Sequence, residues 1–136
     1  MSRANVEIVR RGWEAWQRDD FDTWLSTLDP AVEWHTALER LVGGGENHYR
    51  GIEGMREFWT AYRTELEDIR IEAEELRDVG RDRVLGLGHI SWRGPASGIE
   101  LDSPVGLVFT LRQGKIIQSM NYLSHKEALE AVGLSE

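Results

Sequence analysis

His35 and Tyr122 are the side chains best suited to acid–base chemistry on a small carbonyl compound. An imidazole titrates near neutral pH, so His35 can accept or donate a proton. A buried tyrosine hydroxyl can donate a hydrogen bond to a ligand oxygen, a role that we expect for Tyr122 in preference to Tyr49. Together they predict an isomerase, cyclase or lyase step.

The orientation of His35 decides whether it can take part. Trp34 and His35 are neighbours in a predicted strand, so their side chains face opposite ways. His35 therefore faces the interior only if a bulge turns it inward, and both orientations stay open. His48 in a glycine-rich loop and His125 in a helix cap are expected to be solvated. His89 is expected on the outer face of a strand, where a partner subunit could bury it.

Acidic residues are weaker candidates for proton transfer. Glu100 and Asp102 share a face of a long predicted strand with Gly106. If that face is concave, one of the two could be desolvated enough to hold a proton near neutral pH. The alternative is that both carboxylates face water.

No metal site and no cofactor are predicted. The 4 histidines are too far apart in the sequence for a helical metal-binding pair, and there is no cysteine. The glycine run 43–45 is not followed by the Lys-Ser/Thr pair of a phosphate-binding loop, which argues against a nucleotide.

Aromatic side chains dominate the predicted ligand site, since the chain has 6 tryptophans in 136 residues. Gly86 and Gly88 share a strand face with Ile90 and Trp92 and are expected to leave volume that larger side chains would fill. Aromatic residues at helical spacing also build solid cores, so a filled interior is the alternative. The side chains expected to line the pocket are Trp16, Trp34, Tyr49, Phe58, Tyr62, Trp92 and Met120.

Three amphipathic helices are predicted to present these aromatic side chains, because apolar residues recur at intervals of three and four. The first covers Val6 to Trp16, the second runs from Phe21 to an end at Pro30, and the third from Met55 to Leu66. A strand is predicted over 31–36. The glycine-rich stretch 41–54 is expected to be a loop that could act as a lid.

Four antiparallel strands are predicted in the second half, over 69–74, 84–93, 99–111 and 115–123. Tight turns are expected at 80–83 and 112–115. Ser124 and Glu127 form a capping box at the start of a last helix that Gly133 ends. The order of elements predicts an α+β fold, in which three N-terminal helices pack on a strongly curved antiparallel sheet, with a short C-terminal helix.

Several segments resemble the SnoaL-like branch of the NTF2-like superfamily, and the likeness runs over nearly the whole chain. The segments are the opening amphipathic helix, Asp29–His35, Tyr49–Gly54, Ser97–Glu100 and Gly114–Ile117. The resemblance implies one cone-shaped domain over 1–136 and a homodimer with one pocket in each subunit. Members of the superfamily include isomerases, polyketide cyclases, dehydratases, epoxide hydrolases and binders without activity.

The catalytic residues of ketosteroid isomerases, which belong to this superfamily, are absent. Those enzymes use an Asp base together with a Tyr and a protonated Asp. By motif order, these positions fall on Trp34, on Gly12 or Trp13, and on Gly106 or Leu107 in this chain. The resemblance therefore does not imply isomerase activity.

Composition restricts the partners and the compartment. A formal net charge of −8 argues against nucleic-acid binding, which needs a concentrated positive face. No stretch predicts a membrane span, and the lack of cysteine and of an apolar leader favours the cytoplasm. Leu85, Leu87 and His89 predict an apolar convex sheet face, through which we expect a homodimer.

Three hypotheses about function follow. An enzyme would enclose a polyketide-like or steroid-like carbonyl compound and move a proton with His35 or an acidic residue. A binding protein would hold a small apolar molecule unchanged, and a dimeric scaffold would have a filled interior. An ionisable group inside the pocket would favour the enzyme, whereas an apolar lining would favour binding alone.

Overall fold

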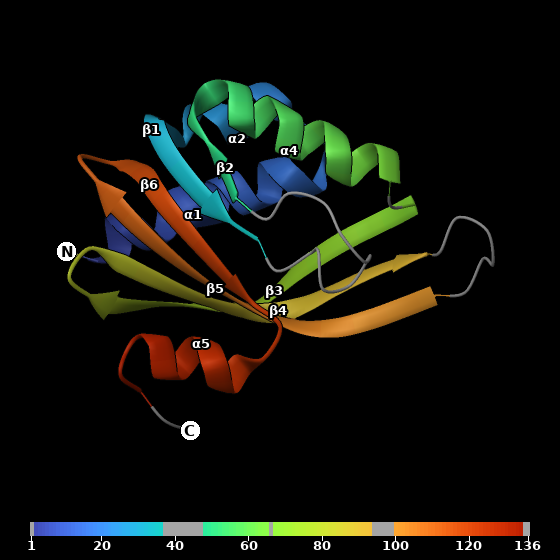
Figure 1. The fold of residues 1–136 in the computed structure, drawn as a ribbon. Coiled ribbons are helices and arrows are strands. Elements are labelled where there is room, and N and C mark those ends of the chain that lie inside the picture. Colours follow the sequence, from blue (N-terminus) through green and yellow to red (C-terminus); the bar gives the residue numbers. More distant parts are fainter. Residues whose placement is uncertain (1, 37–47, 66, 94–99, 135–136) are drawn as a thin grey trace.

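The computed structural model describes residues 2–36, 48–65, 67–93 and 100–134 (Figure 1). Its elements are α1 (Ser2–Gln17), α2 (Phe21–Ser26), β1 (Leu28–His35), β2 (His48–Arg50), α4 (Gly51–Glu65), β3 (Glu67–Gly80), β4 (Arg83–Arg93), β5 (Glu100–Arg112), β6 (Lys115–Tyr122) and α5 (His125–Ala131). The strands form a 6-stranded sheet in the order β2-β1-β6-β5-β4-β3. Neighbouring strands are antiparallel except β1 and β6, which are parallel. The predicted α+β class is confirmed.

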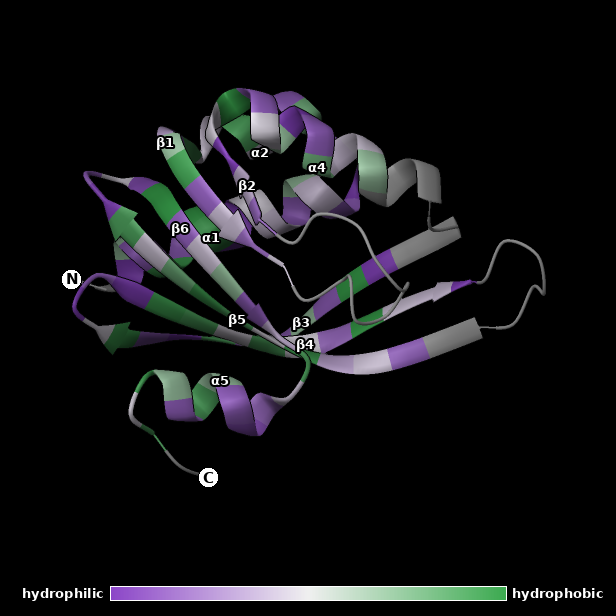
Figure 2. Cartoon of the chain, viewed as in Figure 1, coloured by the Kyte–Doolittle hydropathy of each residue, from purple (hydrophilic) through white to green (hydrophobic). Residues whose placement is uncertain are grey.

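The sheet separates two layers of helix. In Figure 1, α1, α2 and α4 lie against one face and α5 lies against the other. The larger core is built between the sheet and the N-terminal helices, and a smaller core forms where Leu85, Leu87 and Val108 meet Ala128 and Leu129 of α5. Figure 2 shows hydrophobic residues on β4, β5 and β6 where these strands run between the two layers. We call the face toward α1 concave and the face toward α5 convex.

Two tight turns set the registers of the long hairpins, as the sequence predicts. Arg81 and Asp82 have φ values of 57° and 58°, and Gln113 and Gly114 have values of 52° and 78°. Positive φ at both central residues is what a type I′ hairpin turn requires, and this turn matches the twist of the flanking strands. Gly80 accordingly pairs with Arg83, and Arg112 pairs with Lys115.

The structure corrects the boundaries in the first half of the chain. α2 ends at Ser26 and β1 begins at Leu28, so Pro30 lies within a strand instead of ending a helix. The predicted loop over 41–54 contains β2, and α4 begins at Gly51, whose φ of +73° turns the chain sharply from strand to helix. The prediction of a lid falls largely on residues 37–47, which lie outside the described residues.

Gly86 and Gly88 do not leave empty volume, which corrects a second expectation. A Cβ on Gly86 would lie 2.8 Å from the Trp13 ring and 3.2 Å from Leu76 Cδ2. A Cβ on Gly88 would overlap the Glu72 carbonyl oxygen of the neighbouring strand. The first glycine therefore makes room for an indole. The second lets β3 approach β4 closely, beside a register irregularity between Ala73 and Glu75.

Asp20 caps α2, and its contribution to stability depends on pH. Its carboxylate accepts a hydrogen bond from the Thr23 backbone amide at 3.2 Å. Hydrogen bonds from Thr23, supported by the positive charge of Arg18, lower the pKa of Asp20. A lowered folded-state pKa means that the stabilisation is present above the unfolded-state pKa of about 3.9 and is lost as pH falls through the folded value.

We therefore expect Asp20→Ala to destabilise the protein at pH 7 and to cost less near pH 3. Urea unfolding of wild type and variant at both pH values measures the two differences. Asp22→Ala, which removes an acid from the first turn of α2 but not the cap, is the control and should cost less at pH 7. An Asp20→Ala penalty that stays constant with pH would contradict this explanation.

Candidate functional site

A small cavity lies between the N-terminal helices and the concave sheet face. It has a volume of about 50 Å³. A single water needs about 10–15 Å³ on this measure, whereas a cavity that binds benzene has about 150 Å³. An aromatic ligand therefore fits only if the cavity widens. The lining residues are Val9, Gly12, Trp13, Trp16, Trp24, Thr27, Trp34, Phe58, Ile71, Leu107, Phe109, Ile116 and Asn121.

Helical spacing and strand alternation bring the aromatic part of this lining together. Trp13 and Trp16 lie on the inner face of α1, and Trp34 is an inward residue of β1. Trp24 of α2 is at the centre, with ring centroids 5.5 Å from Trp16, 5.9 Å from Trp34 and 6.3 Å from Phe58. These are distances at which aromatic rings attract one another, so the rings form a packed wall.

A buried polar atom of the wall lacks a partner. The Trp34 indole Nε1 makes no hydrogen bond to any of the described residues. By contrast, Trp13 Nε1 donates to the Ile71 carbonyl at 2.6 Å, and Asn121 Oδ1 accepts from Ser119 Oγ at 2.9 Å. A buried donor without an acceptor costs about 1–3 kcal/mol, so an acceptor oxygen placed at Trp34 would relieve that cost.

None of the cavity's lining residues, within the described part of the chain, has a side chain that titrates near neutral pH. The lining offers aromatic surface, one hydroxyl, one amide and one unpaired indole N–H. Asp102, proposed from the sequence as a proton holder, is exposed. This composition can position a ligand oxygen but supplies no general acid or base.

The structure brings three of the predicted pocket residues to the cavity. Trp16, Trp34 and Phe58 line it. Tyr49 packs beside the lining, with its ring centroid 5.3 Å from that of Phe58. Trp92 is buried in the same core without lining the cavity, and the Tyr62 side chain lies outside the described residues.

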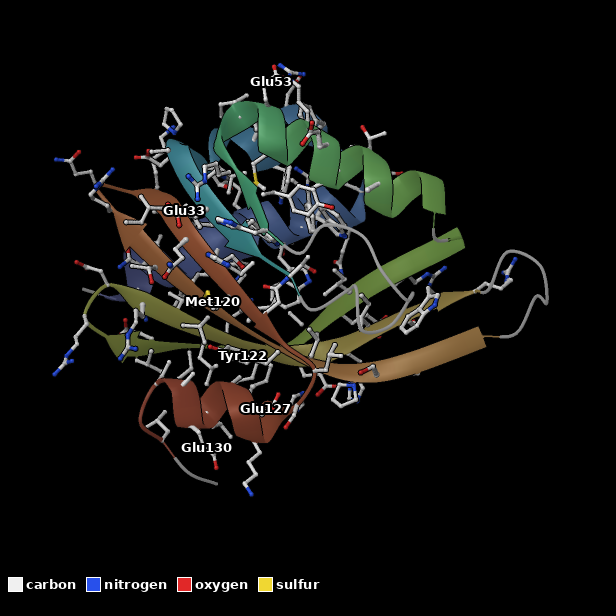
Figure 3. The ribbon with its side chains drawn as sticks, viewed as in Figure 1. Glu33, Glu53, Met120, Tyr122, Glu127 and Glu130 are labelled. Atoms are coloured by element: carbon white, nitrogen blue, oxygen red, sulfur yellow. The ribbon has the colours of Figure 1, made fainter. Side chains whose placement is uncertain are left out.

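Met120 and Tyr122 are not brought to the cavity. Both pack in the smaller core on the convex face, beneath α5, as Figure 3 shows. The cause is a shift in the β5–β6 register between Leu111, which pairs with Ile116, and Thr110, which pairs with Gln118. The extra residue reverses the inward and outward sides of β6 beyond it.

The same shift brings Asn121 into the lining, opposite Leu107. The sequence analysis missed this residue. Regular pairing from the turn would place position 120 opposite Leu107. No residue type in β6 indicates from the sequence that the strand contains a bulge.

His35 lies on the convex side of β1, opposite Trp34 in the strand alternation. There it stacks on His48 of β2, with ring centroids 4.1 Å apart and ring planes at 10°. Burial, and then the neighbouring His48, lower the pKa of His35. His35 and Tyr122 are therefore both separated from the cavity by the sheet, and a catalytic role for them would need a site other than the cavity.

The convex face differs from the expectation made for a dimer. Leu85 and Leu87 are covered by α5 of the same chain. The His89 side chain pairs with Glu74. The centroid of the His125 ring lies 5.8 Å from that of the His89 ring, and His125 Nε2 hydrogen-bonds the Gly88 carbonyl. The homodimer stays a prediction, but these leucines do not provide its exposed surface.

The bent sheet with its helices is the architecture of solved NTF2-like proteins. One of them, of unknown function, from Burkholderia pseudomallei, is 21% identical, with a TM-score of 0.77 over 98% of this chain and 99% of its own. Residues 9–119 match the family model of the SnoaL-like domain. The chain therefore belongs to the SnoaL-like family, and its fold is that of the solved NTF2-like proteins.

Two further solved structures show the same fold. TerC, co-crystallised with polyporic acid, is 22% identical, with a TM-score of 0.78 over 95% of this chain and 98% of its own. A putative SnoaL-like polyketide cyclase from Jannaschia is 20% identical, with a TM-score of 0.73 over 99% and 95%. No curated protein matches the sequence significantly. Among the described helices, none has the length and apolar character needed to cross a lipid bilayer.

Proposed function

We propose that this protein binds a small, largely apolar molecule with an acceptor oxygen in the cavity, and that the cavity does not catalyse acid–base chemistry. The observation that carries the proposal is the aromatic lining, in which the Trp34 N–H is a fully buried polar group without a partner among the described residues. An apolar pocket with few, well-placed polar groups is the usual form of a small-molecule site.

The relatives support the chemical class of the ligand. TerC was crystallised with polyporic acid, and the Jannaschia neighbour is described as a putative polyketide cyclase. By analogy, we propose an oxygenated aromatic or polyketide-like ligand for this chain. Since the cavity measures about 50 Å³, it must widen about threefold to accept even one aromatic ring. A steroid is therefore a poorer candidate than a single-ring compound.

Binding without turnover is the hypothesis that the lining favours. An isomerase, cyclase or lyase needs a group that exchanges a proton with the substrate, and His35 and Tyr122 lie across the sheet from the cavity. The lack of cysteine suits a reducing compartment, so we keep the cytoplasm as part of the proposal.

A matched pair of ligands tests the proposal. Acetophenone and ethylbenzene have similar shapes, but only acetophenone carries an acceptor oxygen. We expect wild type to bind acetophenone more tightly, by about 5- to 30-fold, because only that ligand pairs with the Trp34 N–H. Titrations followed by two-dimensional NMR measure both affinities, and the Trp34 indole N–H resonance should shift with acetophenone.

Two variants separate this hydrogen bond from general packing. Trp34→Phe should remove the preference for acetophenone. Trp13→Phe, which also alters an indole of the lining, should keep it, because Trp13 Nε1 already donates to Ile71. If wild type binds both ligands with equal affinity, the proposed hydrogen bond from Trp34 to a ligand oxygen is refuted. If neither ligand shows saturable binding, the proposed binding site is refuted.

A further inference from the structure

A second group of side chains with chemical potential lies on the convex side of β1 and β2. Glu33 and His35 project from the same side of β1, and His48 is the register partner of His35 on β2. Figure 3 labels Glu33 on β1. The site is separate from the cavity, because the intervening residue Trp34 points to the concave face.

Three potential ligand atoms meet at this place. Glu33 Oε1 lies 3.8 Å from His35 Nε2 and 3.9 Å from His48 Nε2. One ligand atom from each of the three residues can be chosen so that all lie within 4.8 Å of one another. Two ligands of one tetrahedral zinc ion lie about 3.4 Å apart when each bond is about 2.0–2.1 Å. Small side-chain rotations therefore suffice to bring the three atoms around one ion.

One nitrogen atom of the histidine pair is buried and makes no hydrogen bond to a described residue. The atom is His48 Nε2, and Glu33 Oε1, at 3.9 Å, is too far away to accept a normal hydrogen bond from it. A neutral imidazole presents a lone pair to a cation, whereas the protonated ring does not.

We propose that Glu33, His35 and His48 bind a divalent transition-metal ion, with Zn²⁺ the best match. Two imidazoles and one carboxylate are a ligand set that suits zinc and its neighbours in the first transition row, and not Mg²⁺ or Ca²⁺. Three protein ligands leave at least one coordination position for water. Among the described residues, Arg50 lies opposite Glu33 in the register, and its positive charge opposes binding.

The ion would join two strands. β2 is a strand of 3 residues at the edge of the sheet, and its pairing with β1 ends at His48 and His35. A metal bound to both histidines would link this short edge strand to its neighbour. Metal binding should therefore stabilise the folded protein, because the unfolded chain does not hold these ligands together.

Calorimetric titration of the full chain with ZnCl₂ at pH 7.5 tests this site. We expect one Zn²⁺ per chain, a higher melting temperature with Zn²⁺ and none of these effects with MgCl₂. His35→Gln, His48→Gln and Glu33→Gln should each weaken zinc binding at least about tenfold, since each removes a ligand. Substitution by Co²⁺ should give the visible absorption of a tetrahedral site in wild type and not in His48→Gln.

His89→Gln is the matched control. His89 is also a strand histidine beside a glutamate, but it lies on β4 and pairs with Glu74. This variant should bind zinc as wild type does. Lack of saturable binding, unchanged affinity in His35→Gln or His48→Gln, or loss of affinity in His89→Gln would each overturn the proposal. None of these results depends on a ligand in the cavity, so the experiment tests the metal site independently of the proposed function.

Discussion

Replacing Trp24 by alanine is expected to reduce the free energy of unfolding by about 3–5 kcal/mol. Trp24 is buried, with only 3% of its surface exposed, and its ring contacts those of Trp16, Trp34, Phe58 and Trp59. Removing the indole deletes contacts at the centre of the aromatic wall and leaves space that the surrounding rings fill only in part. Urea unfolding of wild type and variant measures the loss.

The same variant tests whether the cavity can hold an aromatic molecule. The space left by Trp24→Ala adjoins the cavity of about 50 Å³, so indole should enter it and restore part of the lost stability. The measurement is the melting temperature of the variant with increasing indole, compared with wild type at the same indole concentrations. We expect a concentration-dependent rise that is clearly larger in the variant than in wild type.

Leu129→Ala is the control for this rescue. Leu129 is buried in the core beneath α5, on the other side of the sheet from the cavity. The variant should lose about 2–5 kcal/mol as a buried leucine does, yet indole should not restore it. If indole stabilises both variants equally, the rescue is not specific to the cavity and the argument from Trp24 fails.

Replacing Gly88 by alanine is expected to cost at least about 3 kcal/mol. The added methyl group would overlap the Glu72 carbonyl oxygen, which is part of the backbone of β3. A side chain can rotate away from a new neighbour, but this oxygen can move only if β3 and β4 separate. Gly88 pairs with Ala73 where the register shifts, so the change would disturb the pairing of β3 with β4 there.

Gly114→Ala separates overlap from backbone strain. Gly114 has φ +78° and nothing within 4 Å of an added Cβ, so its replacement costs only the strain of a left-handed alanine, about 1–2 kcal/mol. Equilibrium unfolding of both variants gives the comparison. A Gly88→Ala penalty no larger than that of Gly114→Ala would show that β3 does not approach β4 as closely as described.

Much of the fold could be predicted because its causes are local. The turns at 80–83 and 112–115 are close in sequence to the strands that they join, and their two-residue form sets the register nearby. The capping bond between Ser124 and the Glu127 amide spans three residues. The aromatic stripe of α1 follows from spacing alone.

The composition of the site was harder to predict. Trp16, Trp34 and Phe58 were predicted for the pocket, and they line the cavity because each lies on the apolar side of its own element. Met120 and Tyr122 were also predicted for the site, but they lie on the convex face because one bulge in β6 exchanges the two sides of the strand beyond it. A one-residue shift changes which side chains are inward without changing the hydrophobic pattern enough to reveal it.

The sequence by itself determined the class of fold, the hairpin turns, the capped last helix and the aromatic character of the interior. These features depend on residues a few positions apart and on the spacing of apolar residues, both of which can be read from a single sequence. Only the tertiary structure decided the size of the cavity, the inward position of Asn121 and the meeting of His35 with His48, 13 positions along the chain. Those outcomes depend on strand register and on packing between segments far apart in the sequence. A register shift of one residue, or a displacement of about an ångström, changes which side chains meet.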